Sequence, residues 1–256
     1  MGSRIQNFRA RLTAGAPLSG TFLKTPSPIV CEVLALAALD VVCLDAEHAP
    51  FGRMEIDGCL AALRAADQPS LVRVAECSAT EIRSALDCGA GGILAPHVSC
   101  AEQARAIVAA ARFGEGGRGY SGATRAGGFG DKAMRDHIAD SHSQTAIIVQ
   151  IEDTAALEAA AAIAAVPGVD CLFVGRVDLA VAMGKEPSVP EVEEAARRVC
   201  AAARTARVAT GVFTTGLEEV ARWRAAGASL FLFGSDQSFV LTEARRLATG
   251  FHARGQ

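Results

Sequence analysis

Short apolar runs alternate with helical stretches along the whole chain. The apolar runs are continuous rather than alternating, which is typical of parallel strands buried on both faces. Turn residues and Ala-rich amphipathic segments separate them. The predicted strands are Pro17–Leu23, Val41–Leu44, Ser70–Val74, Gly92–Ala95, Ala146–Ile151, Val169–Val174, Ala209–Phe213 and Ser229–Phe233.

The segments between the predicted strands have helical spacing. They are Pro28–Leu39, Arg53–Ala66, Ala79–Cys88, Ala101–Ala111, Lys132–Asp140, Thr154–Ala165, Pro190–Ala206 and Leu217–Ala226, with an amphipathic helix over Met1–Leu12 and a final helix containing Glu243–Thr249. Regular alternation without a linker in 256 residues predicts an α/β fold, a single-domain (β/α)8 TIM barrel over residues 1–256. An open doubly wound sheet is the alternative, but no G-x-G-x-x-G follows the first strand, which argues against a dinucleotide site.

One glycine-rich segment, Phe113–Asp131, interrupts this alternation. It carries Arg118, Tyr120 and Arg125 among its glycines. Long irregular segments inside compact domains are usually functional or mobile. We therefore expect an active-site or interface loop near residues 113–131, with a flexible solvent loop as the alternative.

Composition excludes several classes of protein. The chain is 50% hydrophobic with a net charge of −3, and no basic cluster indicates nucleic-acid binding. The apolar runs are too short to span a membrane, and the N-terminus lacks the apolar core of a signal peptide. The 8 cysteines include no C-x-x-C pair, so we interpret them as reduced structural thiols. These features predict a cytoplasmic protein.

The stretch from Ile147 to Asp178 carries the clearest chemical signal. It reads as strand, helix and strand, with Glu152 after the first strand and Asp178 after the second. A right-handed crossover makes the strands parallel, so both acids end on the same side of the sheet. Two carboxylates meeting there can hold a divalent cation. The alternative is that one acid caps a helix and the other is a solvated loop residue.

Other polar residues follow strands on the same predicted rim. Arg73 is a fixed cation suited to a substrate carboxylate or an enolate oxygen. His48 can carry a proton near neutral pH, and Asp45 could orient it, unless His48 is only a surface or packing residue. The set is Asp45, Glu47, His48, Arg73, Gln150, Glu152, Asp178 and Asp236. It predicts a metal-assisted reaction on a small anion without naming the reaction.

Five motifs in order along the chain resemble a known family. They are Asp-Ala-Glu-His-Ala-Pro at 45–50, Leu-Val-Arg-Val at 71–74, Gly-Gly-Ile-Leu-Ala-Pro at 91–96, Val-Gln-Ile-Glu at 149–152 and Val-Gly-Arg-Val-Asp-Leu at 174–179. With them the chain resembles class II pyruvate aldolases of the 4-hydroxy-2-oxoheptanedioate aldolase family. That family belongs to the phosphoenolpyruvate/pyruvate barrel superfamily, which includes citrate lyase beta subunits. The similarity covers most of the chain.

The resemblance implies aldol cleavage and addition of 4-hydroxy-2-oxo acids, with pyruvate and an aldehyde as products, through a metal-stabilised pyruvate enolate. It implies that Glu152 and Asp178 bind the metal, Mg²⁺ or Mn²⁺, with Co²⁺ as a further option. A divalent cation acting as a Lewis acid makes a Schiff-base lysine unnecessary. Lys24 is the one lysine near a strand end, and we do not expect it to be a nucleophile.

The resemblance also implies roles for other residues. Arg73 would stabilise the enolate oxygen, and His48, paired with Asp45, would move the proton. Gln150 would orient the metal site, and the loop at Val177 and Asp178 would bind the pyruvate carboxylate.

The implied assembly is a homo-oligomer, a dimer or a hexamer, with the C-terminal helix exchanged between subunits. Asp87, as a catalytic residue, and Arg125, as a substrate-binding residue, match positions near the aldehyde end, at a subunit boundary.

One residue departs from the family pattern. The family usually reads Gly-Pro-x-Asp where this chain has Gly175-Arg176-Val177-Asp178. Arg176 could contact a second acidic group on the substrate or point to solvent. Two alternatives stay open: an acyl-CoA lyase of the citryl- or malyl-CoA type that uses the same metal site, and a barrel that binds a small carboxylate without turning it over.

Overall fold

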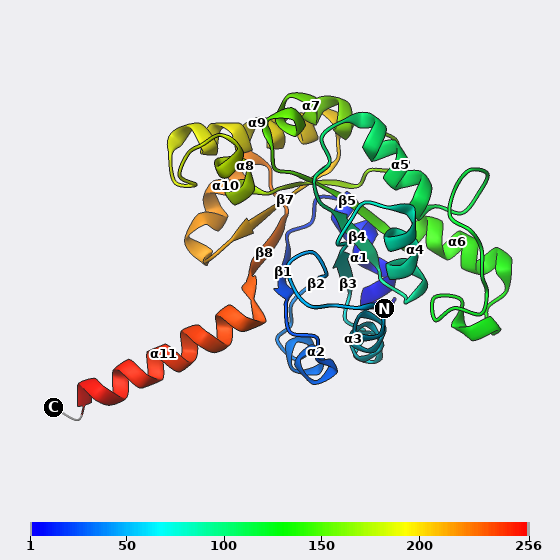
Figure 1. Ribbon diagram of the computed structural model, residues 1–256, viewed down its shortest axis with the longest axis horizontal. Helices are drawn as coiled ribbons and strands as arrows, with labels where there is room; N and C mark the ends of the chain where they lie inside the picture. Colours follow the sequence, from blue (N-terminus) through cyan, green and yellow to red (C-terminus); the bar gives the residue numbers. More distant parts are fainter. Residues whose placement is uncertain (1, 255–256) are drawn as a thin grey trace.

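The computed structural model describes residues 2–254 as a closed parallel barrel surrounded by helices (Figure 1). Met1, where the predicted N-terminal helix begins, lies outside the described residues. The strands follow one another around the barrel in chain order, and the last pairs with the first. The predicted (β/α)8 barrel is therefore confirmed. The strands are β1 Leu18–Leu23, β2 Val41–Asp45, β3 Ser70–Arg73, β4 Gly92–Ala95, β5 Ala146–Ile151, β6 Cys171–Val174, β7 Ala209–Thr214 and β8 Leu230–Ser235.

Each strand is buried on both faces, which explains the continuous apolar runs. In β2, Val41 and Cys43 belong to the cluster inside the barrel, whereas Val42 and Leu44 belong to the layer beneath the helices. Successive side chains of a strand point to opposite faces, so one run of apolar residues supplies both layers.

The helices match the predicted positions closely. They are α1 Arg4–Thr13, α2 Pro28–Ala35, α3 Arg53–Ala65, α4 Ala79–Asp87, α5 Ala101–Ala111, α6 Met134–Gln144, α7 Thr154–Ala164, α8 Arg176–Ala182, α9 Pro190–Ala206, α10 Val220–Ala226 and α11 Asp236–Arg254, with short 3₁₀ turns η1 Gly128–Gly130 and η2 Leu217–Glu219. Side chains of Ser27, Ser78 and Asp153 cap α2, α4 and α7 by accepting backbone N–H groups.

Three helical details differ from the prediction. Helix α6 runs over Met134–Gln144 rather than Lys132–Asp140. Helix α2 ends at Ala35 rather than Leu39, and Ala38 then adopts a left-handed φ of 55° that no helix can contain. Helix α8 was not predicted, because the segment after β6 reads as a loop. As a result Asp178 lies in the first turn of a helix and not at a strand end.

Helix α1 covers the amino end of the barrel. Phe8 and Leu12 are buried in the same cluster as the barrel interior. The guanidinium of Arg9 donates two hydrogen bonds, of 2.9 and 2.8 Å, to the carboxylate of Asp170, just before β6. Because α1 fills the amino end, the carboxyl ends of the strands are left for a site, as is usual in such barrels.

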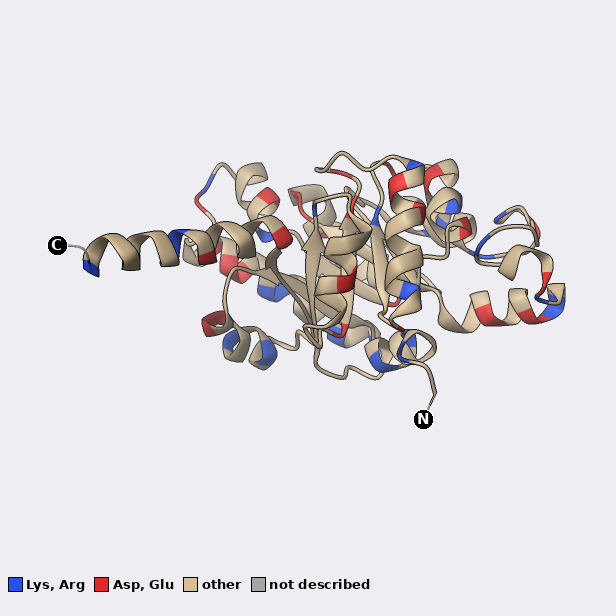
Figure 2. Cartoon of the chain, turned by 90° about the horizontal axis from the view of Figure 1, so that it is seen from below, with Lys and Arg blue, Asp and Glu red and all other residues tan. Residues whose placement is uncertain are grey.

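Helix α11 extends away from the barrel in both views of the chain (Figures 1 and 2). Asp236, at its start, is its one buried residue. Figure 2 also shows acidic and basic residues mixed over the helices rather than separated onto faces. Within residues 2–254, no helix combines the length and apolar character needed to cross a bilayer.

Candidate active site

A cavity of about 730 Å³ lies at the carboxyl ends of the strands. Its floor is aromatic, because Phe22, Phe173 and Phe213 extend up from β1, β6 and β7. The polar and charged residues among those lining it are Lys24, His48, Arg73, Gln150, Arg176, Asp178, Thr215, Ser235, Ser238, Thr242 and Glu243. The predicted rim residues His48, Arg73, Gln150 and Asp178 therefore share one cavity.

Asp45 and Arg73 form a buried ion pair in this site. They are register neighbours at the ends of β2 and β3, which puts their side chains beside each other. Arg73 Nε and Nη2 donate to Asp45 Oδ1 and Oδ2 at 2.9 and 2.7 Å. Burial alone would raise the pKa of Asp45, but hydrogen bonds and charge from Arg73 outweigh it and hold that pKa below its usual range. The pair fixes a cation over the ring of Phe22, at 4.6 Å from its centroid.

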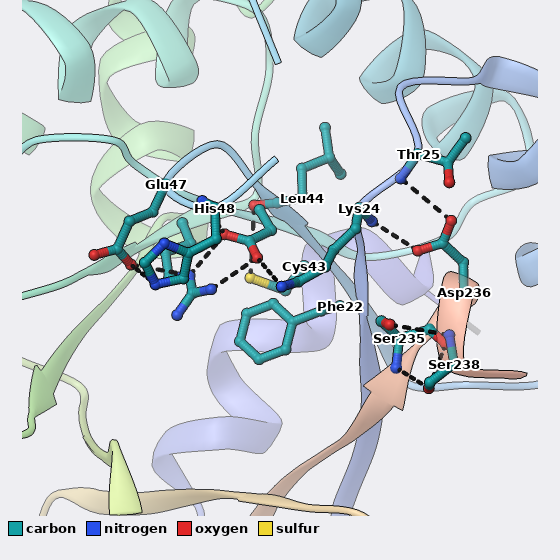
Figure 3. A network of polar contacts seen from close by, with 12 residues as sticks. Phe22, Lys24, Thr25, Cys43, Leu44, Glu47, His48, Ser235, Asp236 and Ser238 are labelled. Carbon is teal, nitrogen blue, oxygen red and sulfur yellow. Dashed lines mark hydrogen bonds and ion pairs between the residues drawn. The ribbon is translucent and has the colours of Figure 1, made fainter. Parts of the chain in front are cut away.

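The contact between Asp45 and His48 differs from the expected one. Asp45 Oδ1 accepts the backbone N–H of His48 at 3.1 Å, whereas ring atom Nε2 of His48 lies 3.7 Å from Glu47 Oε2. The loop after β2 turns the ring away from Asp45, whose oxygens already bind Arg73 and Lys24. Glu47, rather than Asp45, is the carboxylate beside the ring of His48 (Figure 3).

His97 is a site residue that the sequence analysis did not single out. Its backbone N–H donates to Glu152 Oε1 at 2.6 Å, and its ring Nδ1 lies 2.9 Å from the same oxygen. Ring atom Nε2 lies 2.8 Å from Glu47 Oε1, so the ring bridges two buried carboxylates. The residue follows Pro96 at the end of β4 with a left-handed φ of 55°, uncommon for a residue with a side chain. Its position just after a strand was the one feature of the sequence that could have indicated a site residue.

The pKa of Glu152 is shifted in both directions by its surroundings. Glu152 is buried, and burial raises its pKa above the usual range. Hydrogen bonding and charge from His97 lower that pKa, whereas the negative charge of Asp178 raises it. Gln150 donates its side-chain amide to Glu152 Oε2. Glu152 follows β5 and is joined to Gln150, which lines the same cavity as Asp178 of α8.

The residues present fit a divalent metal. Two carboxylates that repel each other are stabilised by a cation between them, and carboxylate and amide oxygens suit Mg²⁺ or Mn²⁺. The buried oxygens Glu47 Oε2 and Gln150 Oε1 lack hydrogen-bond partners in the described part of the chain. A Cβ atom at Gly175 would lie 2.7 Å from Glu152 Cβ and 2.9 Å from Gln150 Nε2, so the backbone is close to these side chains.

A metal here would depend on few protein ligands. Among residues 2–254, no group of three or more His, Cys, Asp or Glu side chains is arranged to hold a metal ion. A site of two carboxylates leaves the other positions to water and substrate, which is how proteins commonly bind Mg²⁺.

Lys24 and Asp236 hold the rim of the cavity together. Lys24 Nζ lies 3.3 Å from Asp45 Oδ2. Asp236 accepts the backbone N–H groups of Lys24 and Thr25 at 2.7 and 3.2 Å, which fastens the start of α11 to the loop after β1 (Figure 3). Asp236 therefore anchors a helix, whereas Lys24 lines the cavity.

Arg176 forms an ion pair and is largely shielded from solvent. Its Nη1 and Nη2 donate to Glu219 Oε1 and Oε2 at 2.8 and 2.9 Å. The side chain is 19% exposed. Of the two roles left open for Arg176, pointing to solvent is therefore excluded.

Asp87 and Arg125 do not line the cavity of their own chain. Asp87 pairs with Arg118, and Arg125 Nε donates to Asp57 Oδ1 at 2.7 Å. Asp87 ends α4, and the main-chain carbonyl of Asp87 accepts the N–H of Ala126 from the glycine-rich segment. In such a barrel the carboxyl ends of the helices lie beside the amino ends of the strands. Asp87 and Arg125 are therefore separated from the other predicted site residues, which lie at the carboxyl ends of the strands.

A closed parallel barrel whose carboxyl-end cavity gathers acids, an arginine and a histidine has the architecture of a TIM-barrel enzyme. The chain belongs to the HpcH/HpaI aldolase/citrate lyase family, whose model matches residues 18–242. The family resemblance of the five motifs is thus confirmed.

Relatives and solved structures agree with this family. A hydroxypyruvate/pyruvate aldolase of Paraburkholderia phytofirmans is 34% identical over 93% of this chain and 95% of its own length. A 5-keto-4-deoxy-D-glucarate aldolase of Klebsiella pneumoniae is 36% identical over 95% and 96%. The crystal structure of a family member from Burkholderia cenocepacia has a TM-score of 0.91 and 35% identity, covering 96% of this chain and 99% of that one. The chain is accordingly an enzyme of the carbon–carbon lyase type.

Proposed function

We propose that this chain is a divalent-metal-dependent aldolase that cleaves 4-hydroxy-2-oxo acids to pyruvate and an aldehyde and also runs the reverse addition. The carrying observation is geometric: Asp178, Arg73 and Gln150 line one cavity, and the side-chain amide of Gln150 donates to Glu152. The names of the two relatives, both aldolases of oxo acids, support this reaction type.

Glu152 and Asp178 would hold Mg²⁺ or Mn²⁺, with Co²⁺ as a further option. When bound, such an ion supplies a Lewis acid that polarises the 2-oxo group. Gln150, through its hydrogen bond to Glu152, orients that carboxylate. Val177 lines the cavity next to Asp178 and would contact the pyruvate carboxylate through its backbone.

Arg73 would stabilise the negative oxygen of the pyruvate enolate. Asp45 holds its Nε and Nη2, which fixes the plane of the guanidinium. The third nitrogen, Nη1, makes no hydrogen bond to the residues 2–254 and can donate to substrate in the cavity that Arg73 lines. A preorganised donor of this kind is worth more in a buried site than in water.

His48 would accept the proton of the 4-hydroxyl during cleavage and return it during addition. Its ring is half-exposed at the cavity, where a substrate hydroxyl can reach it, and Glu47 lies beside its Nε2. A positioned base is needed because breaking the carbon–carbon bond requires an alkoxide-like oxygen on the aldehyde fragment.

Metal removal and one pair of variants test the proposal. Protein treated with EDTA should lose cleavage of a 4-hydroxy-2-oxo acid, measured as pyruvate release, and regain it with Mn²⁺. Glu152→Gln should lose activity, whereas Glu158→Gln, an exposed acid on the helix that follows, should keep it. Full activity after metal removal would refute the assignment.

Lys24 allows a check on the Schiff-base route. Its Nζ lies 3.3 Å from the buried carboxylate of Asp45, and an amine held in such an ion pair is a poor nucleophile. Borohydride added with pyruvate should therefore leave the protein mass unchanged. A pyruvate adduct on Lys24 would assign the enzyme to the other aldolase class.

The alternative function, an acyl-CoA lyase, would use the same carboxylates and differs from the proposed aldolase in its substrate. Rates on a citryl- or malyl-CoA thioester and on a free 4-hydroxy-2-oxo acid should be compared under one set of conditions. The proposal requires the free acid to react faster.

We also propose that the protein is a homo-oligomer, a dimer or a hexamer, in which α11 is exchanged between copies. Apolar side chains on α11, among them Val240, Leu247 and Phe251, are exposed. Helix α2 exposes Ile29 and Val33, and its C-cap residue Leu36 is exposed beside them. Exposed stripes on two helices of one chain suit a self-complementary contact.

Asp87 and Arg125 would then act at a neighbouring copy. Neither reaches the cavity of its own chain, so a role at the aldehyde end requires a subunit boundary.

Light scattering after gel filtration tests the assembly. The natural chain should elute as a dimer or hexamer, and Leu247→Glu with Phe251→Glu should give smaller species. A monomeric natural chain would contradict the proposal.

All 8 cysteines are free thiols, several of them buried. We propose a cytoplasmic location on this basis, since such compartments keep thiols reduced. Fractionation of the native cell is the direct measurement, and recovery outside the cytoplasm would oppose it.

A further inference from the structure

Arg176 and Glu219 join the segment that carries Asp178 to the helices beside it. Arg176 is the first residue of α8, two positions before Asp178, and Glu219 ends η2 just before α10. The two side chains form a fork of parallel hydrogen bonds at 2.8 and 2.9 Å. They are 19% and 15% exposed, so the pair is partly protected from solvent.

Glu219 is itself held by further charged groups. Arg222 donates to Glu219 and, at 2.8 Å, to Glu193 on α9. The guanidinium of Arg176 also lies 5.7 Å from the ring centroid of Trp223, which is fully buried. Glu219, the partner of Arg176, is therefore held by other ion pairs and lies in a packed part of the structure.

Within residues 2–254, the fork from Arg176 is the one set of side-chain hydrogen bonds that α8 makes. Helix α8 has seven residues, too few to be stable by its own hydrogen bonds. Gly175, its N-cap, has no side chain to cap it. Leu179 and Ala180 are buried, but Val177 and Val181 are exposed at 49% and 73%. Hydrophobic packing therefore holds one face of α8 and leaves the other face exposed.

We propose that the Arg176–Glu219 pair is a tether that positions Asp178 for the metal site. This inference rests on the proposed function, because Asp178 is there a metal ligand. Arg176 and Glu219 are positioning residues: they act through the orientation of α8 and do not touch the reacting atoms. Glu219 takes one hydrogen bond from each outer nitrogen of Arg176, which fixes the plane of the guanidinium.

The same pair forms part of the wall between two cavities. Arg176 and Thr215 line both the active-site cavity and a neighbouring cavity of about 470 Å³, which Glu219 also lines. Breaking the pair therefore removes a link across the wall that separates the two cavities.

The first test compares Glu219→Gln with Glu158→Gln. Both substitutions remove a carboxylate that pairs with arginine. Glu219 pairs with Arg176 and Arg222, whereas Glu158 and Arg198 form an exposed pair between α7 and α9. Glu219→Gln should speed amide hydrogen exchange in residues 176–182 about tenfold and weaken Mn²⁺ binding in calorimetry about tenfold, as loss of one charge-assisted pair predicts. Glu158→Gln should change neither.

A double-mutant cycle tests whether the effect passes through Arg176. In an Arg176→Gln background, Glu219→Gln should add no further change in Mn²⁺ affinity or in exchange of residues 176–182. Equal effects in both backgrounds would overturn the tether. So would a lower melting temperature with unchanged exchange and Mn²⁺ affinity, because that is the result of a merely structural pair.

The two proposals fail in different ways. If the natural chain binds no Mn²⁺, the metal-dependent function is wrong and Asp178 has no metal to be positioned for. Exchange of residues 176–182 still reports the tether itself in that case, and unchanged exchange in Glu219→Gln removes it.

Discussion

Asp45→Asn tests whether the charge of Asp45 holds the strand ends of this site together. Asp45 is fully buried and accepts two hydrogen bonds from Arg73, one from the backbone of His48 and an ion pair from Lys24. An amide has one acceptor oxygen, so its NH₂ group would face a guanidinium donor. Arg73, itself largely buried, would lose half of its fork.

The expected cost is large because both charges are buried. Removing one partner of a buried ion pair costs about 3–5 kcal/mol of stability. Because the amide oxygen of Asn still accepts one hydrogen bond, we expect about 3 kcal/mol for Asp45→Asn. For a domain of this size that lowers the melting temperature by about 6–12 °C. Asp57→Asn is the matched control, since Asp57 forms the same fork with Arg125 but both side chains are about a quarter exposed. It should cost at most about 1 kcal/mol.

Urea unfolding followed by circular dichroism measures both variants. EDTA removes the contribution of metal binding, and one fixed protein concentration keeps the contribution of subunit binding equal for the two variants. If the unfolding free energies of Asp45→Asn and Asp57→Asn differ by less than about 0.5 kcal/mol, within ordinary experimental scatter, burial does not strengthen the Asp45–Arg73 pair.

Two further predictions concern the same site. The folded pKa of Asp45 lies below its ordinary value of 3.8, so the stabilisation from its charge is complete above that value and is lost as the pH falls toward the folded pKa; unfolding at a series of acidic pH values should show a shallower loss for Asp45→Asn than for the natural chain. Gly175→Ala puts a Cβ 2.7 Å from Glu152 Cβ and should cost about 1–3 kcal/mol and weaken Mn²⁺ binding, measured by unfolding and calorimetry, whereas an unchanged Mn²⁺ affinity would show that the site tolerates the methyl group.

The identity of several site residues could be predicted because a parallel barrel places strand ends together. Arg73 at the end of β3 and Asp45 at the end of β2 are neighbours by register alone. Glu152 follows β5 by one residue, and Asp178 follows β6, one βα unit later. Periodicity determines which residues end strands, and topology then makes them neighbours.

Contacts that depend on loops and short helices could not be predicted in this way. His97 reaches both Glu47 and Glu152 only because its backbone turns into the left-handed region after Pro96. Helix α8 has too few residues for a periodic pattern, so neither its existence nor the partner of Arg176 was visible.

The sequence by itself determined the barrel, its strand order and the acids, arginine and histidine at its rim, because a period-two or helical pattern is a local property of the chain. The tertiary structure alone decided which of these groups pair. The Asp45 carboxylate binds Arg73 rather than the ring of His48. Arg176 pairs with Glu219, and Asp87 pairs with Arg118 away from the cavity. Ion pairs form between side chains that the folded loops bring within about 4 Å, and separation along the sequence does not fix that distance.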